Sequence, residues 1–164
     1  MKGWMGLKGW IGSIWALSLV LVAAAAAPGP LPYDEKADAA AALQQGLKTA
    51  QAQHKDVLVI FGANWCPDCR ELDQALHRSD SKLIDSHFIV VKIDIGNWDH
   101  NLELAKRYGN PISKGIPAAV VLSPNDQLLY ATKAGELADA RHMSDQSIYE
   151  FFSKVISDTR QHGA

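Results

Sequence analysis

Residues 57–70 read Val-Leu-Val-Ile-Phe-Gly-Ala-Asn-Trp-Cys-Pro-Asp-Cys-Arg. The first five residues are apolar, which is typical of a strand buried on both faces of a sheet. The stretch ends in Cys-Pro-Asp-Cys at 66–69 and leads into a helical pattern, with Leu72 and Leu76 four positions apart on one face. The sequence therefore predicts a buried strand, a loop, and a helix whose first turn carries both cysteines.

The spacing of the two cysteines suits redox chemistry. Residues three apart share one face of a helix, so the two sulfurs can bridge without moving the backbone. Cys66 comes first, at the helix N-terminus, where free amide N–H groups and the helix dipole favour an anion and lower the pKa of a thiol. Pro67 suits the first helical position, where its missing N–H is not needed. We therefore predict that Cys66 is the attacking nucleophile and that Cys69, further into the helix and more buried, is the resolving thiol.

Two other roles for the cysteines fit the sequence less well. A purely structural disulfide across so short a loop would constrain the unfolded chain little. A zinc site needs about four ligands, whereas the chain has 2 cysteines and its 6 histidines follow no ligand spacing. A Cu(I) site, which prefers soft sulfur ligands, is a third role, with His142 and Met143 contributing if their loop folds over the cysteines. For the redox role we expect no metal and no cofactor.

The chain resembles the thioredoxin superfamily in two separate motifs. One is Trp65 followed by Cys-Pro-Asp-Cys after an apolar strand, and the other is Gly-Ile-Pro at 115–117 directly before the apolar run 118–122. The resemblance extends from about Lys36 to the C-terminus, and it is greatest to exported thioredoxin-like proteins with a Trp-Cys-Pro-Asp-Cys site. It implies an α/β fold: a three-layer sandwich with a mixed central sheet of about four strands, helices on both faces and an added N-terminal helix.

The resemblance also implies a substrate site beside the cysteines. In the family, the proline that matches Pro117 is cis and faces the cysteine loop. The backbone of Ile116 is then expected to pair with an extended stretch of substrate, as a short added strand. Trp65 and Pro117 are expected to supply apolar surface next to the sulfur of Cys66.

The dipeptide between the cysteines departs from thioredoxin itself, which has Gly-Pro where this chain has Pro67 and Asp68. A negative charge in the loop disfavours a thiolate, so Asp68 is expected to raise the pKa of Cys66 and to favour a reductant. The alternative is that Asp68 points into water and is screened. Both residues are therefore candidates for tuning the pKa of the nucleophile.

A second departure concerns the base for Cys69. Thioredoxin carries a buried Asp six residues before its first cysteine, where this chain has Ile60, and that Asp helps to deprotonate the resolving cysteine. Asp73, one turn after Cys69, is a candidate replacement, and the alternative is that it faces water. Lys92 matches a lysine that neighbours the buried Asp in the family, so its role here is open.

The N-terminal segment is distinct from the rest of the chain. Residues 1–27 combine Lys2 and Lys8 with an uncharged run rich in Leu, Val and Ala that ends in small residues, the pattern of a secretory signal peptide. An uncleaved membrane anchor facing the periplasm is the alternative, because the run is at the short edge for a spanning helix. Residues 28–35 read as a stiff Pro-rich linker and 36–164 as one thioredoxin-like domain. We expect a periplasmic or otherwise exported protein that meets the membrane only through this segment.

The remaining sequence alternates helical and strand patterns. Helices are expected at 33–53, 81–86 and 102–108 and after a Ser144 cap, and strands at 88–93, 118–122 and 127–132. The last two strands should form a hairpin across a Pro-containing turn. Asn97 or Asp99 is expected to cap the helix that stops at Gly109. The formal net charge is −2 and no basic block is present, so nucleic-acid binding has no support.

These features together predict an exported thiol–disulfide oxidoreductase that reduces protein disulfides by dithiol exchange. Its partners would be proteins that contain disulfides and a membrane-embedded electron donor that restores the dithiol in an oxidising compartment. The alternatives are a thiol oxidase or isomerase of the same fold, a Cu(I)-handling assembly factor, and a binding module without catalysis.

Overall fold

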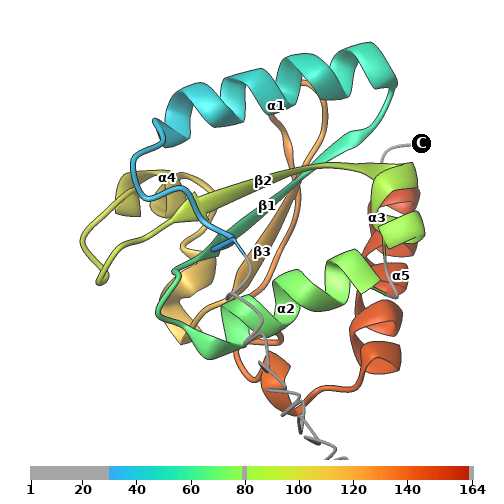
Figure 1. Ribbon diagram of the computed structural model, residues 1–164. Helices are drawn as coiled ribbons and strands as arrows, with labels where there is room; N and C mark the ends of the chain where they lie inside the picture. Colours follow the sequence, from blue (N-terminus) through green and yellow to red (C-terminus); the bar gives the residue numbers. More distant parts are fainter. Residues whose placement is uncertain (1–29, 79–80, 163–164) are drawn as a thin grey trace, which may run out of the picture.

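The computed structural model describes residues 30–78 and 81–162, so the predicted signal peptide lies outside the described residues. These residues form a four-stranded sheet in the order β2-β1-β3-β4. Helix α1 (Ala39–Gln53) covers one face of the sheet, and α2 (Pro67–Arg78) and α5 (Asp145–His162) cover the other (Figure 1). The predicted three-layer arrangement with a mixed sheet and an added N-terminal helix is confirmed. None of the helices within the described ranges is long and apolar enough to cross a membrane.

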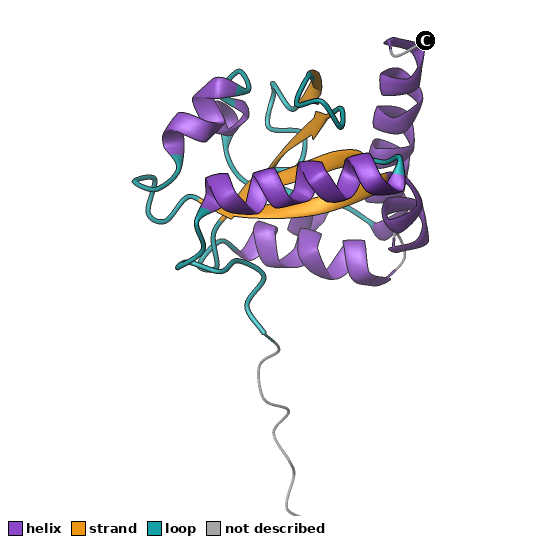
Figure 2. Ribbon diagram, turned by 90° about the horizontal axis from the view of Figure 1, so that it is seen from above, coloured by secondary structure: helices purple, strands orange, loops and turns teal. Residues whose placement is uncertain are grey.

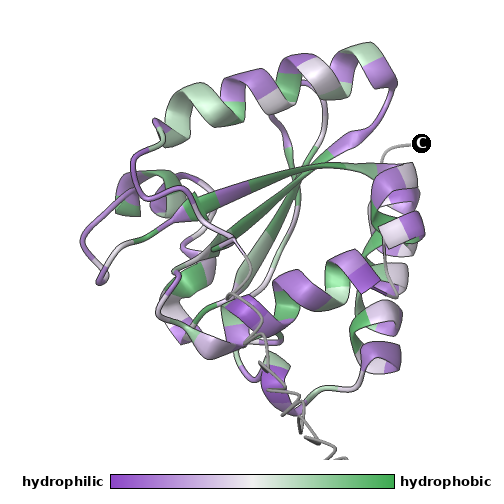
Figure 3. Cartoon of the chain, viewed as in Figure 1, coloured by the Kyte–Doolittle hydropathy of each residue, from purple (hydrophilic) through white to green (hydrophobic). Residues whose placement is uncertain are grey.

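The two central strands are the most apolar part of the chain. Strand β1 (Asp56–Gly62) pairs in parallel with β2 (Phe88–Asp94) and antiparallel with β3 (Ala118–Leu122). Every residue of β3 and all but the first residue of β1 are buried, which explains why these segments read as continuous apolar runs (Figure 3). Strand β4 (Leu128–Ala131) completes the expected antiparallel hairpin with β3.

Helix α1 begins later than its Ala-rich pattern indicated. Asp38 is its N-cap, and the Asp38 carboxylate accepts a hydrogen bond of 3.0 Å from the backbone N–H of Ala41. Leu43, Leu47 and Ala50 face the core, and the helix lies over the sheet when the molecule is seen from above (Figure 2). The residues before the cap are therefore not helical, and they lead to the cysteine site.

The other helices are short except for the last. They are α3 (Ser81–His87), α4 (Leu102–Arg107) and the 3-10 helices η1 (Pro111–Lys114) and η2 (Ala140–His142). Ser144 caps α5 as predicted, since its hydroxyl accepts a hydrogen bond of 3.1 Å from the Ser147 N–H. The predicted capping of α4 is wrong: its N-cap is Asn101, which makes no side-chain cap bond and instead donates to the Asp94 carbonyl at 2.7 Å. The Asp99 carboxylate is used within the preceding loop, where it accepts from the Asn97 N–H.

Candidate active site

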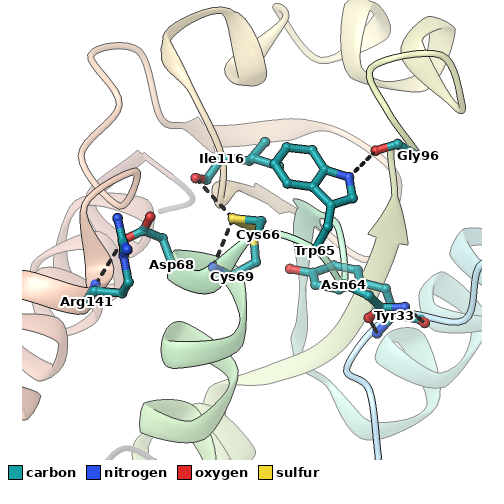
Figure 4. Close-up of a disulfide and its surroundings, with 9 residues drawn as sticks. All are labelled: Tyr33, Asn64, Trp65, Cys66, Asp68, Cys69, Gly96, Ile116 and Arg141. Carbon is teal, nitrogen blue, oxygen red and sulfur yellow. Dashed lines mark hydrogen bonds and ion pairs between the residues drawn. A yellow bond between two sulfur atoms is a disulfide. The ribbon is translucent and has the colours of Figure 1, made fainter.

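The two cysteines form a disulfide at the start of α2. Cys66 directly precedes the helix, Pro67 is its first residue, and the Cα atoms of Cys66 and Cys69 are 5.3 Å apart. The backbone N–H of Cys69 donates a hydrogen bond of 3.1 Å to Cys66 Sγ (Figure 4). This amide is one of those that a helix N-terminus leaves without a carbonyl partner, so it stabilises negative charge on Cys66 once the disulfide opens. Both cysteines are buried, Cys69 fully and Cys66 with 3% exposure, and their roles as resolving thiol and nucleophile stay predictions.

The fold brings the second motif against this disulfide from about fifty positions away in the chain. The Ile116 carbonyl oxygen lies 3.7 Å from Cys66 Sγ (Figure 4), and the Ile116–Pro117 bond is cis, as predicted. Gly115 makes this approach possible, because its φ of 120° is a conformation that L side chains rarely adopt. The cysteine loop and the cis-proline loop therefore lie next to each other in this structure. Pairing of Ile116 with substrate stays a prediction.

Trp65 forms an exposed aromatic surface next to the disulfide. Its side chain is fixed, because the indole Nε1 donates a hydrogen bond of 2.8 Å to the Gly96 carbonyl at the start of the loop after β2 (Figure 4). The residue nevertheless remains 51% exposed. A rigid, exposed aromatic ring at this position can contact a bound polypeptide without losing much conformational freedom.

Asp68 does not point into water, so that alternative interpretation is wrong. The residue is 8% exposed, and Asp68 Oδ1 accepts hydrogen bonds of 3.0 Å from the Arg141 backbone N–H and 3.1 Å from Arg141 Nε (Figure 4). A buried carboxylate needs such partners. Arg141 belongs to η2, in a connection whose sequence has no periodic pattern, so sequence reasoning missed it. The charge of Asp68 near Cys66 is thus partly balanced by a guanidinium.

Asp73 is also partly buried and paired, not free in water. Asp73 Oδ1 forms an ion pair with Lys92 Nζ, and the two side chains are 19% and 25% exposed. The structure thereby joins the two residues that the resemblance had singled out separately. A role for Asp73 as the base for Cys69 stays a prediction.

A third polar feature near Cys69 was missed by sequence reasoning. Tyr33, inside the range expected to be linker, is 4% exposed and belongs to the core. Asn64, two positions before Cys66, accepts a hydrogen bond of 3.0 Å from the Tyr33 N–H and donates one of 2.8 Å to the Tyr33 carbonyl (Figure 4). The packed chain therefore begins at least three residues ahead of Lys36. The only signal in the sequence was a lone aromatic residue after a Pro-rich stretch.

His142 and Met143, suggested as additional Cu(I) ligands, have other contacts in the structure. His142 Nδ1 pairs with Asp139 Oδ1 at 2.5 Å on the exposed surface of η2, and Met143 is partly buried against the hydrophobic core. Across residues 30–78 and 81–162, no group of three or more His, Cys, Asp or Glu side chains comes together in a way that could hold a metal ion.

The fold and the site define the class: a thioredoxin-like disulfide oxidoreductase fold with its Cys-x-x-Cys pair at the start of a helix and a cis-proline beside it. A family model described as thioredoxin-like matches residues 38–124. A solved structure of a disulphide isomerase from Xylella fastidiosa Temecula1 is 53% identical, covers 77% of this chain and 98% of its own, and has a TM-score of 0.75. The chain belongs to the thioredoxin-like family.

Two solved structures match at lower identity. A thioredoxin from Thermus thermophilus is 22% identical, with coverages of 70% of this chain and 81% of its own and a TM-score of 0.48. The C-terminal domain of DsbD from Neisseria meningitidis in the oxidised form is 23% identical, with coverages of 70% and 94% and a TM-score of 0.45. The comparison with curated proteins finds no match.

Proposed function

We propose that this protein is an exported thiol–disulfide oxidoreductase that reduces disulfides in protein substrates. The observation that carries the proposal is the position of Cys66 Sγ, at the start of α2 and 3.1 Å from the Cys69 N–H that points at it. Export rests on the sequence pattern of residues 1–27.

The reaction needs only the two thiols of the reduced protein. The Cys66 thiolate attacks one sulfur of the substrate disulfide, a Cys66–substrate bond forms, and the other substrate sulfur leaves as a thiolate. The Cys69 thiolate then attacks Cys66 Sγ, restores the Cys66–Cys69 disulfide and releases the second substrate sulfur. The substrate gains two electrons and the protein loses two, so a partner must return them. We assign that role to a membrane-embedded electron donor.

We expect the groups on the two sides of Cys66 Sγ to bind the substrate. Trp65 offers a fixed exposed ring, and the cis-proline loop offers the backbone of Ile116 and the ring of Pro117. An extended segment of substrate that pairs with Ile116 brings its disulfide to Cys66, since backbone pairing is independent of side-chain identity. This arrangement suits unfolded or partly folded protein substrates.

The reducing direction is supported by two features of this chain. Asp68 places a carboxylate close to the nucleophile, although Arg141 opposes its charge. In addition, the domain from Lys36 onward is too short to hold the large helical insertion that DsbA-like oxidants carry.

Isomerase activity is the second candidate, because the 53% identical Xylella structure is described as a disulphide isomerase. Both activities begin with attack by Cys66 and differ in what resolves the mixed disulfide. A reductase uses Cys69, whereas an isomerase leaves the attack to another thiol of the substrate.

The decisive experiment compares two assays and one equilibrium measurement on the mature protein. A reductase should accelerate dithiothreitol-driven insulin reduction, depend on Cys69, and have a potential near the thioredoxin value of about −270 mV in glutathione equilibration. An isomerase should recover activity from scrambled ribonuclease with Cys69→Ser retaining much of its effect. A potential near the DsbA value of about −120 mV would instead indicate an oxidase.

A further inference from the structure

The hydroxyl of Tyr33 is a buried polar group without an evident partner. The residue is 4% exposed, and among the described residues no hydrogen bond to its hydroxyl oxygen is found. A buried hydroxyl without a partner is costly, and native structures rarely keep one without a reason.

The Tyr33 hydroxyl faces the resolving cysteine across Gly62. A Cβ atom placed at Gly62 would overlap the Tyr33 hydroxyl oxygen and would lie 3.0 Å from Cys69 Sγ. The oxygen and the sulfur are therefore within 3.0 Å of one common point. Glycine fits there because it has no Cβ atom to overlap the hydroxyl oxygen.

The position of Tyr33 is set by the active-site loop. Asn64 binds both the N–H and the carbonyl of Tyr33, and its Nδ2 also donates to Glu35 Oε1 at 2.9 Å. This amide is itself buried, with 8% exposure. The segment ahead of α1 is thus hydrogen-bonded to the residue two positions before Cys66, which fixes its position relative to the site.

The phenol remains protonated in this environment. Burial, and then the negative charges of Asp73 on α2 and Asp94 on β2, raise the pKa of Tyr33 well above its ordinary value. Lys92, also on β2, forms its ion pair with Asp73. A neutral phenol can donate a hydrogen bond but cannot serve as a base at physiological pH.

We propose that Tyr33 donates a hydrogen bond to the Cys69 thiolate during resolution of the mixed disulfide. This inference rests on the proposed dithiol exchange. In the Cys66–Cys69 disulfide the sulfur is a poor acceptor and the hydroxyl lacks a partner. When substrate occupies Cys66, the buried Cys69 thiol gives its proton to Asp73, its candidate base one turn further along α2, and the resulting thiolate is a strong acceptor for the hydroxyl. The thiolate then attacks Cys66 Sγ, the bond to substrate breaks, and the substrate sulfur leaves with the electron pair.

The assignment accounts for the apolar residue at position 60. Ile60 is 2% exposed and offers no acid or base. In this chain the group that stabilises the Cys69 thiolate comes from the segment before α1 instead of from β1. Tyr33 then supplies a hydrogen bond to a charged group, and such bonds are stronger than those between neutral groups.

The test uses the reduced mature protein and 5,5′-dithiobis(2-nitrobenzoate) in a stopped-flow instrument. Attack by Cys66 releases one nitrothiobenzoate, and attack by Cys69 on the mixed disulfide releases the second at a rate independent of concentration. With Tyr33→Phe we expect the second step to slow about tenfold at neutral pH, and its pH profile to move up by about one unit. At high pH the two proteins should reach the same rate.

Tyr108→Phe is the matched control, because Tyr108 is equally buried but its hydroxyl binds Asp126 at 2.6 Å, away from the cysteines. It should leave both steps unchanged. An unshifted pH profile for Tyr33→Phe, or a loss of rate that is equal at every pH, would overturn the role of the hydroxyl. Absence of the second release in the unsubstituted protein would instead overturn the proposed dithiol exchange itself.

Discussion

Arg141 binds the carboxylate of Asp68 through both its backbone N–H and its side chain, at 3.0 and 3.1 Å. The contact joins η2 to the first turn of α2, beside Cys66, the proposed nucleophile. It turns the charge between the two cysteines from an isolated carboxylate into a paired one. The redox potential of the disulfide should therefore depend on both residues.

The first prediction is a double-mutant cycle on this pair. Asp68→Asn should lower the pKa of Cys66, because Arg141 then acts without its counter-charge, and should raise the potential, because a stabilised thiolate favours the reduced form. Arg141→Ala should do the opposite. Each half unit in the pKa of Cys66 corresponds to roughly 15 mV for this two-electron couple. Thiolate absorbance near 240 nm and glutathione equilibration measure the two quantities.

The double variant should return close to the starting values if the two charges act only against each other. Arg78→Ala is the control. Arg78 is the last residue of α2, at the end away from the cysteines, and its ion pairs are with Glu71 and Asp145. A potential that falls with Asp68→Asn would contradict the electrostatic argument for a reductant.

The second prediction separates the two cysteines. Iodoacetamide should label Cys66 first in the reduced protein, because Cys66 is at the helix start and Cys69 is fully buried. Cys66→Ser should abolish insulin reduction, and Cys69→Ser should trap mixed disulfides that a non-reducing gel resolves. Faster alkylation of Cys69 would reverse the assigned roles.

The part of the site that the sequence could predict is the part carried by local patterns. The apolar run of β1, the Cys-Pro-Asp-Cys loop and the Gly-Ile-Pro before β3 each have a recognisable signature, and strand pairing then places them together. The Tyr33–Asn64 and Asp68–Arg141 contacts join residues 31 and 73 positions apart. Neither has a periodicity or spacing, because a polar side chain that meets a distant backbone group obeys no repeat. The contacts that we propose tune the cysteines are for this reason the ones that required the structure.

The third prediction concerns Gly62, where β1 passes between Tyr33 and Cys69. Gly62→Ala should lower the free energy of unfolding by about 1–3 kcal/mol, as overpacking of a well-packed core does. The new Cβ would lie 2.5 Å from Cζ of Tyr33. That ring cannot easily retreat, since Asn64 holds the Tyr33 backbone from both sides. Urea unfolding of the oxidised protein measures the loss, and an unchanged midpoint would mean that the segment before α1 is loosely held.

The fourth prediction is export with cleavage. The pattern of residues 1–27 predicts that the protein recovered from cells begins between about Ala25 and Pro28. Intact-mass spectrometry of the purified protein locates this end directly. Recovery of the chain with Met1 in the membrane fraction would establish the anchor instead.

The last prediction concerns alkaline pH and follows from three tyrosines whose phenols resist ionisation in the folded state. Burial comes first among the causes for each: it raises the pKa of Tyr33 and Tyr108 well above the ordinary value, and that of Tyr130 to about 12. The unfolded chain ionises these groups near pH 10. The folded protein keeps its protons, so its stability is fully present below pH 10 and is lost as the pH rises from there toward 12 and beyond.

The measurement is the free energy of unfolding of the oxidised protein between pH 8 and pH 12, compared with its Tyr→Phe variants. Tyr33→Phe and Tyr108→Phe should each flatten the decline above pH 10, because phenylalanine has no proton to lose in the unfolded state. Tyr149→Phe, at an exposed position on α5, should leave the curve parallel to that of the unsubstituted protein. A decline that is equally steep with and without the Tyr33 hydroxyl would mean that this phenol ionises as easily in the folded protein as in the unfolded chain. It would then lose the property that makes it a hydrogen-bond donor to Cys69.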